Sequence, residues 1–579
     1  MGQGMRQAEK NPVAKAFDEC RPLLYGAFGF GFFINILMLA VPIYSLQVLD
    51  RVLSSGSLDT LAALTVMAVV ALIFMGILQA LRLVVFSHIG RWLDDRLSDE
   101  IVEKTVTRAV GDPSVGTQPL RDLNTLRNFV TSQHLGTLFD APFAIIFFIV
   151  IYAISVPLGI AVTFGAVVLG LLAFLAQRLP SAPAAMANDE QVRSMQSIDA
   201  LVRNAEVVKA MGLLHNATIK WRWSNQRRLS HSFLSANLAT VIAQITRTIR
   251  LGLQIAVMGF GAYLALNDLL SPGAIIAVSI LTARALAPFD AAAPLYQSLV
   301  GVLKALQRLD DLHLESSELK PKTMRLPEAK GNLILQKVTY EAPGSGRWIL
   351  RGINLEIPAG TAVGIIGPSG SGKTTLARMI VGVLQPTTGM VRLDGAALHQ
   401  WDPAQLSRAI GYLPQGIELF DGTIAENIAR LDPNPDDDAV IQAAQTAMVH
   451  EAILAFPKGY HTDIGPGGAL LSAGQRQRIA LARCFYGDPK LIVLDEPNAN
   501  LDGEGEIAFA QALGNAKRLG ITTLTIAHRP QLLRSVDKTL VMQNGEARIY
   551  GPTDEVMAEL SQGLSKIQPL PPRRHGAQS

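Results

Sequence analysis

Cysteine is scarce in this sequence, and its scarcity excludes two kinds of structural support. The chain has 579 residues but only two cysteines, Cys20 and Cys484, and neither belongs to a Cys-x-x-Cys pair or lies beside a histidine cluster. A disulfide framework or a structural zinc site needs more cysteines at closer spacing. Both cysteines are therefore expected to be ordinary buried or free thiols.

Charge is also low. Charged residues make up 17% of the chain, and the net charge of +3 is small and says little about nucleic acid. No nucleic-acid partner is expected. Hydrophobic residues instead reach 49% and the mean hydropathy is +0.27, which is high for a soluble protein. A signal peptide is not expected either. The first twenty residues are polar, and the apolar run after them is too long for a signal peptide.

The apolar residues gather in runs that are long enough to cross a membrane, which takes about 20 residues for about 30 Å of hydrocarbon. Any one run could be a buried helix of a soluble protein, but such a succession makes that alternative improbable. Arg284 and Asp290 interrupt the last run, where they could line a polar path or pair with each other. The six predicted spans are 23–48, 60–86, two within 139–175 divided at the Ser-Val-Pro turn of 155–157, 249–266 and 273–299.

Positive charges predict how these spans are oriented. Lys and Arg are concentrated before the first span, between the second and third, and between the fourth and fifth, whereas the other connections are short. Positively charged loops stay in the cytoplasm, so both termini are expected there. The two long cytoplasmic segments have apolar residues at helical spacing, as in LVRNAEVVKAMGLL. The spans are therefore expected to continue as helices beyond the membrane.

The composition divides the chain into five segments. Residues 1–20 are expected to be cytoplasmic and 21–310 to form a membrane domain. Residues 311–331 are predicted to be a linker, 332–565 a soluble α/β domain, and 566–579 a disordered tail. The predicted fold class is a membrane all-α domain with six transmembrane helices, followed by an α/β P-loop domain.

A glycine-rich loop, GPSGSGKTT, follows a short apolar strand and opens a helix. In that context the pattern G-x-x-x-x-G-K-[ST] predicts binding of ATP or GTP. Lys373 should reach the β- and γ-phosphates, and Thr374 should place its hydroxyl on Mg²⁺. The residues expected to contact the nucleotide here are Gly367, Pro368, Ser369, Gly370, Ser371, Gly372, Lys373, Thr374 and Thr375.

Polar residues follow other strands of the predicted sheet. The apolar strand in KLIVLDEP ends at Asp495, which is expected to hold Mg²⁺, and Glu496, which is expected to be the general base for water. Gln415 could reach Mg²⁺ or the attacking water, and His528 could contact the γ-phosphate. Asp502 follows within PNANLD. Taken singly, each of these last three is more often a surface or capping residue.

A second possible phosphate-binding helix start lies in GPGGALLSAGQRQRIALAR, where a Gly- and Ser-rich run precedes a helix. GPSGSGKT, Gln415, LSAGQ, LIVLDE, PNANLD and His528 together resemble, in the right order, the nucleotide-binding domain of ABC transporters. LSAGQ is similar to the family signature LSGGQ, with Ala473 in place of a glycine, and its function is expected to survive.

This resemblance explains why one chain carries both helix starts. It implies that Ser472, Gly474 and Gln475 of one copy contact the ATP held by the phosphate loop of another, with Asp502 also at the nucleotide. It assigns catalytic roles to Glu496, His528, Lys373 and Gln415, and it assigns Mg²⁺ to Thr374, Gln415 and Asp495. A homodimer with twelve spans is implied. A heterodimer is the alternative, but every catalytic element of this chain is intact.

The membrane half resembles a narrower group. Residues 119–148 and 204–214 are similar to the type I secretion exporters of Gram-negative bacteria, which export proteases, lipases, glycanases and haem-binding proteins. The resemblance implies ATP-driven export of unfolded protein across the inner membrane. It also implies a periplasmic adaptor, an outer-membrane channel and a C-terminal signal on the cargo. Coupling helices are expected near 112–126 and 207–215. No peptidase-like domain is expected before the first span, and leader cleavage is not expected either.

Two alternatives and one open position remain from the sequence. An exporter of lipids or drugs would have the same architecture and need no adaptor. An ATP-dependent regulatory protein without transport is the third possibility, and the intact Glu496 and His528 argue against it. The family often stacks an aromatic residue under the adenine. Ala342 holds that position here, and Tyr340 or Trp348 could substitute.

Overall fold

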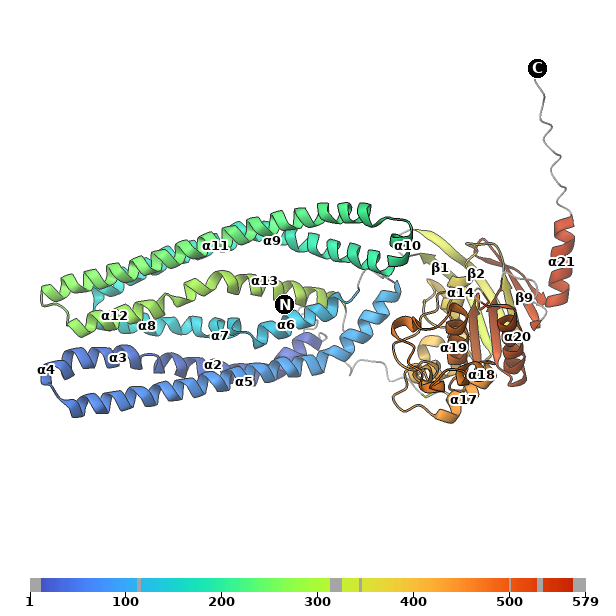
Figure 1. Ribbon diagram of the computed structural model, residues 1–579, viewed down its shortest axis with the longest axis horizontal. Coiled ribbons are helices and arrows are strands. Elements are labelled where there is room, and N and C mark those ends of the chain that lie inside the picture. Colours follow the sequence, from blue (N-terminus) through green and yellow to red (C-terminus); the bar gives the residue numbers. More distant parts are fainter. Residues whose placement is uncertain are drawn as a thin grey trace, which may run out of the picture. The chain divides into compact units, whose positions relative to one another are not determined.

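The computed structural model describes residues 12–111, 116–312, 325–342, 346–498, 501–527 and 535–565 (Figure 1). The chain divides into two compact units, Met1–Lys320 and Pro321–Ser579. We call them the helical unit and the α/β unit. Of the predicted linker 311–331, residues 313–324 lie outside the described residues, as does the predicted tail 566–579.

The helical unit contains two helices of more than 50 residues, α5 and α11, and both exceed the length that crosses a membrane. The elements are α2 (Pro12–Leu37), α3 (Ala40–Gln47), the π-helix η1 (Val48–Val52), α4 (Leu53–Ser55), α5 (Leu58–Gly111), α6 (Gln118–Thr131), α7 (Gln133–Asp140), η3 (Ala141–Phe143), α8 (Ala144–Ile154), α9 (Val156–Arg203), α10 (Ala205–Ala210), α11 (Leu214–Leu266), α12 (Pro272–Ala285) and α13 (Ala287–Asp311).

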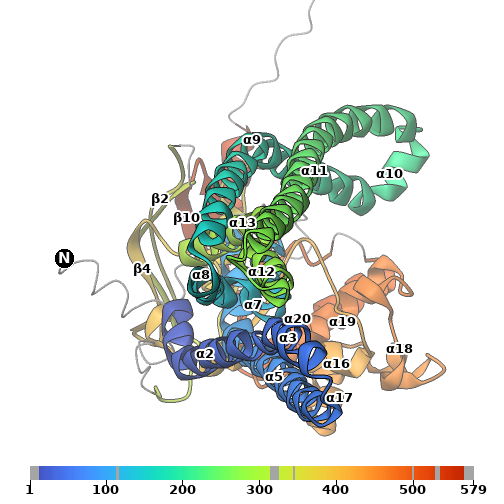
Figure 2. The same ribbon diagram turned by 90° about the vertical axis from the view of Figure 1, so that its left-hand side faces the viewer.

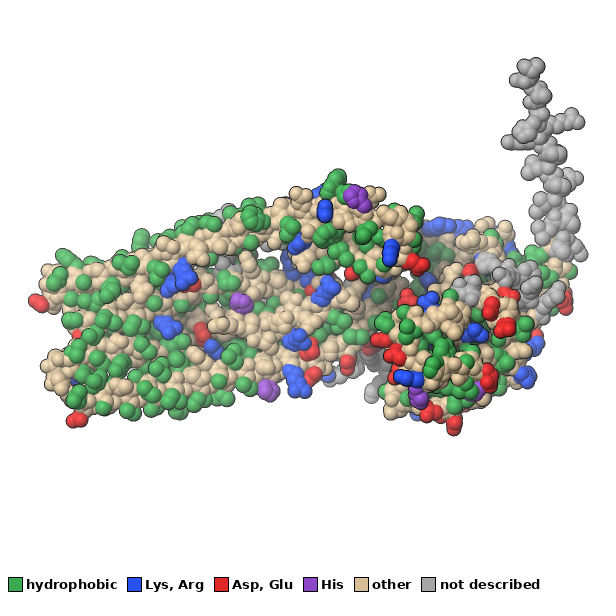
Figure 3. All heavy atoms as spheres, viewed as in Figure 1, with side chains coloured by type: hydrophobic (Ala, Val, Ile, Leu, Met, Phe, Trp, Pro, Cys, Tyr) green, Lys and Arg blue, Asp and Glu red, His purple; other side chains and the backbone are tan. Residues whose placement is uncertain are grey.

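Six helical segments in the described residues are long and apolar enough to span a membrane, which confirms the predicted number. Hydrophobic side chains cover the half of the unit that holds the α3, α4 and α12 ends, and Lys and Arg are more frequent farther along the helices (Figure 3). The segments are Val13–Ser55, Leu58–Gly111, Gln133–Ile154, Val156–Leu175, Leu214–Leu266 and Pro272–Ala292. The chain is thus a multi-pass membrane protein.

Short interruptions separate neighbouring helices where the sequence disfavours helix. Ser155 adopts an extended conformation between α8 and α9, and a proline occupies the first turn of α9. Leu286 separates α12 from α13. Coupling helices are predicted near 112–126 and 207–215. In the first range, residues 112–115 lie outside the described residues. In the second range, the short helix α10 ends and α11 begins. Helices α9 and α11 run side by side along much of their length (Figure 2).

Polar contacts tie the spans together. Arg82 Nη1 lies 2.6 Å from Asp140 Oδ1, which joins α5 to α7. The Asp50 carboxylate in η1 accepts hydrogen bonds from the Ser271 hydroxyl and, at 2.7 Å, from the Gly273 amide at the start of α12. These contacts pair polar groups of neighbouring helices within the helical unit.

One proposed pairing within the spans is wrong. Asp290 pairs with Arg250 of α11 at 2.8 Å rather than with Arg284. Arg284 belongs to α12 and is exposed, whereas Asp290 belongs to α13 beyond the break at Leu286. The sequence could not indicate that α11 approaches Asp290 from 40 residues away.

The α/β unit contains two sheets. An antiparallel sheet has the strand order β2-β1-β4-β5, and a six-stranded sheet has the order β10-β9-β3-β8-β7-β6. In the larger sheet, β9, β3, β8, β7 and β6 are parallel and β10 is antiparallel. The strands are β1 (Leu333–Ala342), β2 (Arg347–Ile357), β3 (Ala362–Ile366), β4 (Thr388–Leu393), β5 (Ala396–Ala397), β6 (Ile410–Leu413), β7 (Leu491–Asp495), β8 (Thr522–Ile526), β9 (Lys538–Gln543) and β10 (Glu546–Pro552).

Helices and apolar clusters cover this sheet. Strands β7 and β8 are buried at every residue, as expected for parallel strands with helices on both faces. Cys484 is buried in one cluster and is a free thiol, as is Cys20, which confirms the expectation for both. The helices are α14 (Lys373–Ile380), η5 (Leu398–Gln400), α15 (Pro403–Ala409), α16 (Ile424–Ile428), α17 (Asp437–Thr446), α18 (His450–Leu454), η6 (Gly459–His461), η7 (Pro466–Gly468), α19 (Ala473–Phe485), α20 (Gly503–Arg518) and α21 (Thr553–Ser565).

Candidate functional site

The glycine-rich loop, 367–375, joins the end of β3 to the first turn of α14. Gly370 and Gly372 have φ values of 79° and 95°, which side-chain-bearing residues rarely adopt. A Cβ atom on Gly367 would lie 2.2 Å from the Met542 carbonyl oxygen. These glycines are therefore required for the tight turn, and they bring backbone amides toward the N-terminus of α14, where anions bind favourably.

Lys373 begins α14 and lies over this loop. Its Nζ donates hydrogen bonds to the carbonyls of Gly367, at 2.8 Å, and Pro368, at 3.0 Å. Burial lowers the pKa of Lys373, and the charges of Glu496 and Asp495 oppose that shift. The ammonium group is thus held among carbonyl dipoles beside the loop, where a phosphate would provide it with a full counter-charge.

Asp495 is the last residue of β7, and only 1% of its surface is exposed. Neither carboxylate oxygen makes a well-formed hydrogen bond. Burial raises the pKa of Asp495 above 3.8 and Glu496 adds to this rise, whereas Thr374 and the nearby Arg378 lower it. An unpaired buried carboxylate is costly, and oxygen ligands are those that Mg²⁺ prefers. The pair formed by Asp495 and Thr374 therefore fits a magnesium ion.

Glu496 follows directly and turns out of the strand. Its φ is 53°, a left-handed value that is uncommon for a residue with a side chain. Its amide donates to the Ile526 carbonyl at 3.2 Å, so the turn is tied to the end of β8. Strained backbone of this kind persists where the surrounding structure enforces it, often at functional sites. The two adjacent acids consequently differ in both orientation and burial.

The other predicted residues follow neighbouring strands. Gln415 is exposed two residues after β6, which lies beside β7. Asp502 is the N-cap of α20 and accepts a hydrogen bond from the Gly505 amide at 2.8 Å. His528 lies outside the described residues, directly after Ala527. The carboxyl ends of parallel strands share one edge of a sheet, so β3, β7 and β6 bring the phosphate loop, the acids and Gln415 to that edge.

The LSAGQ segment begins a helix as the sequence predicts. Ser472 is the exposed N-cap of α19, and its hydroxyl accepts from the Gln475 amide at 3.2 Å. The Gln475 side chain in turn accepts from the Ser472 amide at 2.9 Å. This reciprocal capping arrangement fixes the helix start, whose partial positive charge faces solvent.

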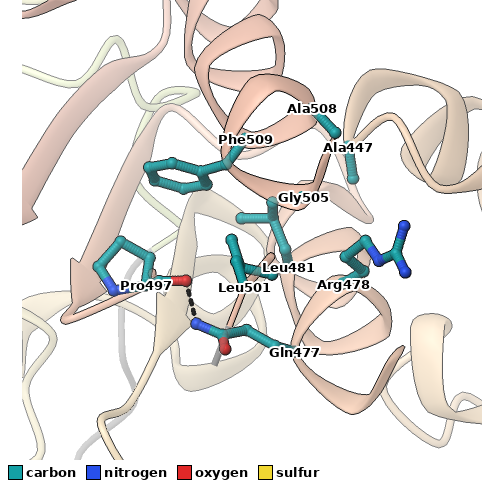
Figure 4. Close-up of a pocket in the computed structure, with 9 residues that line it drawn as sticks. All are labelled: Ala447, Gln477, Arg478, Leu481, Pro497, Leu501, Gly505, Ala508 and Phe509. Carbon is teal, nitrogen blue, oxygen red and sulfur yellow. Dashed lines mark hydrogen bonds between the residues drawn. The ribbon is translucent and has the colours of Figure 1, made fainter. Parts of the chain in front are cut away.

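One buried residue near the acids was not predicted. Gln477, with 2% of its surface exposed, donates from Nε2 to the carbonyl of Pro497, the residue after Glu496 (Figure 4). Together they border a cavity of about 10 Å³ between α19 and α20, which is too small for more than one water molecule. The cavity therefore marks the place where α19, the helix that begins in LSAGQ, packs against the turn that follows Asp495 and Glu496. No local signal marks Gln477, because its partner is 20 residues away.

The two aromatic residues considered for adenine stacking differ in their exposure. Trp348 lies on β2 with 41% of its surface exposed, whereas Tyr340 is partly buried and packs against the core between the sheets. Of the two aromatic residues considered for stacking, Trp348 has the more accessible ring. Its contact with adenine stays a prediction.

Two family models and several known proteins are similar to this chain. The family model described as "ABC transporter" matches residues 350–499, and the model described as "ABC transporter transmembrane region" matches residues 24–288. The type I secretion system ATP-binding protein PrsD of Rhizobium meliloti is 38% identical over 552 residues, covering 94% of each chain. The leukotoxin translocation ATP-binding protein LktB of Bibersteinia trehalosi is 33% identical, over 92% of this chain and 76% of that protein.

A solved structure gives the fold independently. A bacterial Atm1-family ABC exporter with ATP bound superimposes with a TM-score of 0.80 at 21% identity, covering 95% of this chain and 99% of the other. At this identity the likeness supports the fold alone. The predicted order, a helical membrane domain followed by an α/β P-loop domain, is confirmed.

Proposed function

This chain belongs to the ABC transporter family, and from that premise we propose that two copies form the inner-membrane exporter of a type I secretion system. The chain is an ATPase coupled to transport, and its function is ATP-driven protein export. The observation that carries this function is the 38% identity to a type I secretion ATP-binding protein over 94% of both chains. The leukotoxin translocation protein supports the same class of cargo.

ATP binds at the loop of residues 367–375. Backbone amides and Lys373 hold the phosphates, and Thr374, Asp495 and Gln415 would hold Mg²⁺. When bound, the ion neutralises charge on the phosphate oxygens. Glu496 accepts a proton from the attacking water, since its left-handed turn directs it away from the strand. His528 contacts the γ-phosphate in this proposal.

Each ATP site is completed by a second copy of the chain. Ser472, Gly474 and Gln475 present the capped, solvent-facing start of α19, which suits contact with a γ-phosphate already held by another phosphate loop. Asp502 lies at the same interface. A chain with one loop and one signature has two half-sites, so a homodimer supplies two complete ones. A heterodimeric partner is the alternative.

The proposed assembly extends beyond the inner membrane. Both termini are cytoplasmic, and lipids surround the six spans. A periplasmic adaptor and an outer-membrane channel continue the path, and the cargo is an unfolded protein with a C-terminal signal. Type I secretion by the relative PrsD supports these partners.

The test compares proteins in the culture medium of cells that carry the wild type, Lys373→Ala or Lys458→Ala. Lys373→Ala removes the phosphate-binding cation, so one or a few proteins should disappear from the medium. Lys458 is exposed before η6, and its variant is the matched control, expected to secrete normally. An unchanged medium together with altered membrane lipids or drug tolerance would favour the general exporter instead.

A further inference from the structure

A polar recess of about 340 Å³ lies among α9, α11 and α13 of the helical unit. Gln244, Arg247 and Arg250 line it from α11, and Asp290 lines it from α13. Arg250 Nε lies 2.8 Å from Asp290 Oδ2, so these two charges offset each other. Arg247 lies near Asp290 but forms no hydrogen bond or salt bridge with any residue that the structure describes. The recess therefore has one excess positive charge.

The recess lies at the same end of all three spans. Ala173 lines it near the end of the span Val156–Leu175, and Phe289 and Asp290 line it near the end of Pro272–Ala292. On α11, Gln244 and Arg247 precede the apolar stretch that starts at 249, and Arg250 lies in its first turn. In the proposed orientation this is the cytoplasmic level, where phospholipid headgroups lie. Basic pockets between spans at this level suit anionic headgroups.

An exposed apolar stripe continues from Arg247 along α11. Leu251, Ile255 and Met258 follow at helical spacing on the same side, with 48%, 73% and 50% of their surfaces exposed. Eleven residues of helix rise about 16 Å, which is about half the hydrocarbon thickness of a bilayer. A cation at one end of an apolar stripe of this length matches a phospholipid, with headgroup and acyl chain in line. If the recess belonged to a path for a polypeptide, polar residues would be expected to continue along α11 in place of this apolar stripe.

We propose that the recess binds the phosphate of an anionic phospholipid, with Arg247 as its main contact and an acyl chain along Leu251, Ile255 and Met258. Gln244 can donate to the same headgroup, and Phe289 forms part of the apolar wall. The planar guanidinium group suits bidentate contact with a phosphate. This lipid site goes beyond the proposed export function. The recess would bind the lipid regardless of which protein the chain exports.

Native mass spectrometry of the purified full chain tests this site. The protein would be titrated with phosphatidylglycerol or phosphatidylethanolamine of identical acyl chains. Wild type should prefer phosphatidylglycerol, and Arg247→Ala should weaken that binding at least about tenfold, because a charge-assisted contact is lost. Arg227→Ala removes an exposed charge of α11 outside the recess and should bind like wild type. Leu251→Ser should weaken the binding of long-chain phosphatidylglycerol more than the binding of dihexanoyl phosphatidylglycerol.

Several outcomes would overturn the proposal. Equal phosphatidylglycerol binding by wild type and Arg247→Ala would show that Arg247 does not bind the lipid phosphate, which contradicts the proposal. Displacement of the lipid by an equal concentration of inorganic phosphate would assign the recess to a free anion. Loss of the dimer mass in Arg247→Ala would show that a second copy covers it. Lost secretion with unchanged lipid binding would assign it to cargo. Loss of secretion in Lys373→Ala is independent of all four, so the two proposals can fail separately.

Discussion

At the scale of single residues, two neighbouring acids have been given different environments by the backbone between them. Asp495 ends a buried strand and has no well-formed hydrogen bond at either carboxylate oxygen. Glu496 is turned out of the strand by its positive φ and is only partly buried. A cation-binding carboxylate and a proton-accepting one require such a difference, because one must face the ion and the other the water.

The buried carboxylate predicts an effect on stability. Burial, followed by the charge of Glu496, raises the pKa of Asp495 above 3.8, so its ionised form destabilises the nucleotide-free protein at neutral pH. Asp495→Asn should raise the Tm without nucleotide by about 2–4 °C, corresponding to about 1 kcal/mol. The gain should fade as the pH falls through the raised pKa, because wild-type Asp495 then becomes neutral too.

Thermal unfolding of the full chain at several pH values would measure this. The exposed Asp421→Asn is the matched control, and no gain is expected from it. Added ATP and Mg²⁺ should stabilise wild type but not Asp495→Asn. A lower Tm for nucleotide-free Asp495→Asn would mean that the carboxylate has a stabilising partner within the chain.

At the scale of elements, an ion pair fixes α6 against α13. Arg308 Nη2 donates to Asp122 Oδ1 at 2.6 Å and its Nε donates to Oδ2 at 2.8 Å. Asp122 is almost fully buried, whereas the Arg308 side chain is 43% exposed. The hydrogen bonds to Asp122 raise the pKa of Arg308, so its guanidinium group keeps its charge. Its bidentate geometry joins the helix after the second span to the helix that leaves the sixth.

Arg308→Ala should therefore destabilise the helical unit by about 1–2 kcal/mol, since it leaves the Asp122 carboxylate without its cation and solvent screens part of the loss. Arg121→Ala removes an exposed arginine of α6, next to Asp122 in the chain, and should have little effect. Thermal unfolding of the full chain would compare them. If Arg308→Ala and Arg121→Ala unfold at the same temperature, the ion pair contributes nothing to the packing of these helices.

The elements also show how far the sequence could be interpreted. Six apolar runs predicted the six spans, because the need to bury about 20 apolar residues in lipid acts locally. The phosphate loop was predicted for the same reason, since its glycines are required by adjacent backbone. The Arg250–Asp290 pair and the Gln477–Pro497 hydrogen bond join residues 20 to 40 positions apart, so they depend on packing. The capping bond from the Gly505 amide to Asp502 is local, in contrast, and the sequence suggested it as a general tendency of aspartate.

At the scale of the whole molecule, the proposed ATP site takes its parts from two chains. A dimer of Lys373→Ala chains has two defective phosphate loops, and a dimer of Ser472→Arg chains has two defective signatures. A mixed dimer confines both defects to one site and leaves the other intact. Equal co-expression of the two variants should restore about a quarter of wild-type ATPase activity, because about half the dimers are mixed and have one working site.

ATPase assays on the co-purified mixture would measure this recovery. The control mixes the two variants after separate purification under conditions that prevent exchange, where no activity is expected. Failure of the co-expressed mixture to exceed either variant alone would contradict a composite site formed by two copies.

Helix α11 has a mechanical consequence. It runs for 53 residues from Leu214 to Leu266 without a proline, the commonest cause of sharp kinks. At 1.5 Å per residue it is a lever of about 80 Å, so a tilt of about 5° at one end displaces the other by about 7 Å. A movement the width of one side chain at its polar end would therefore be transmitted to its apolar end without any joint.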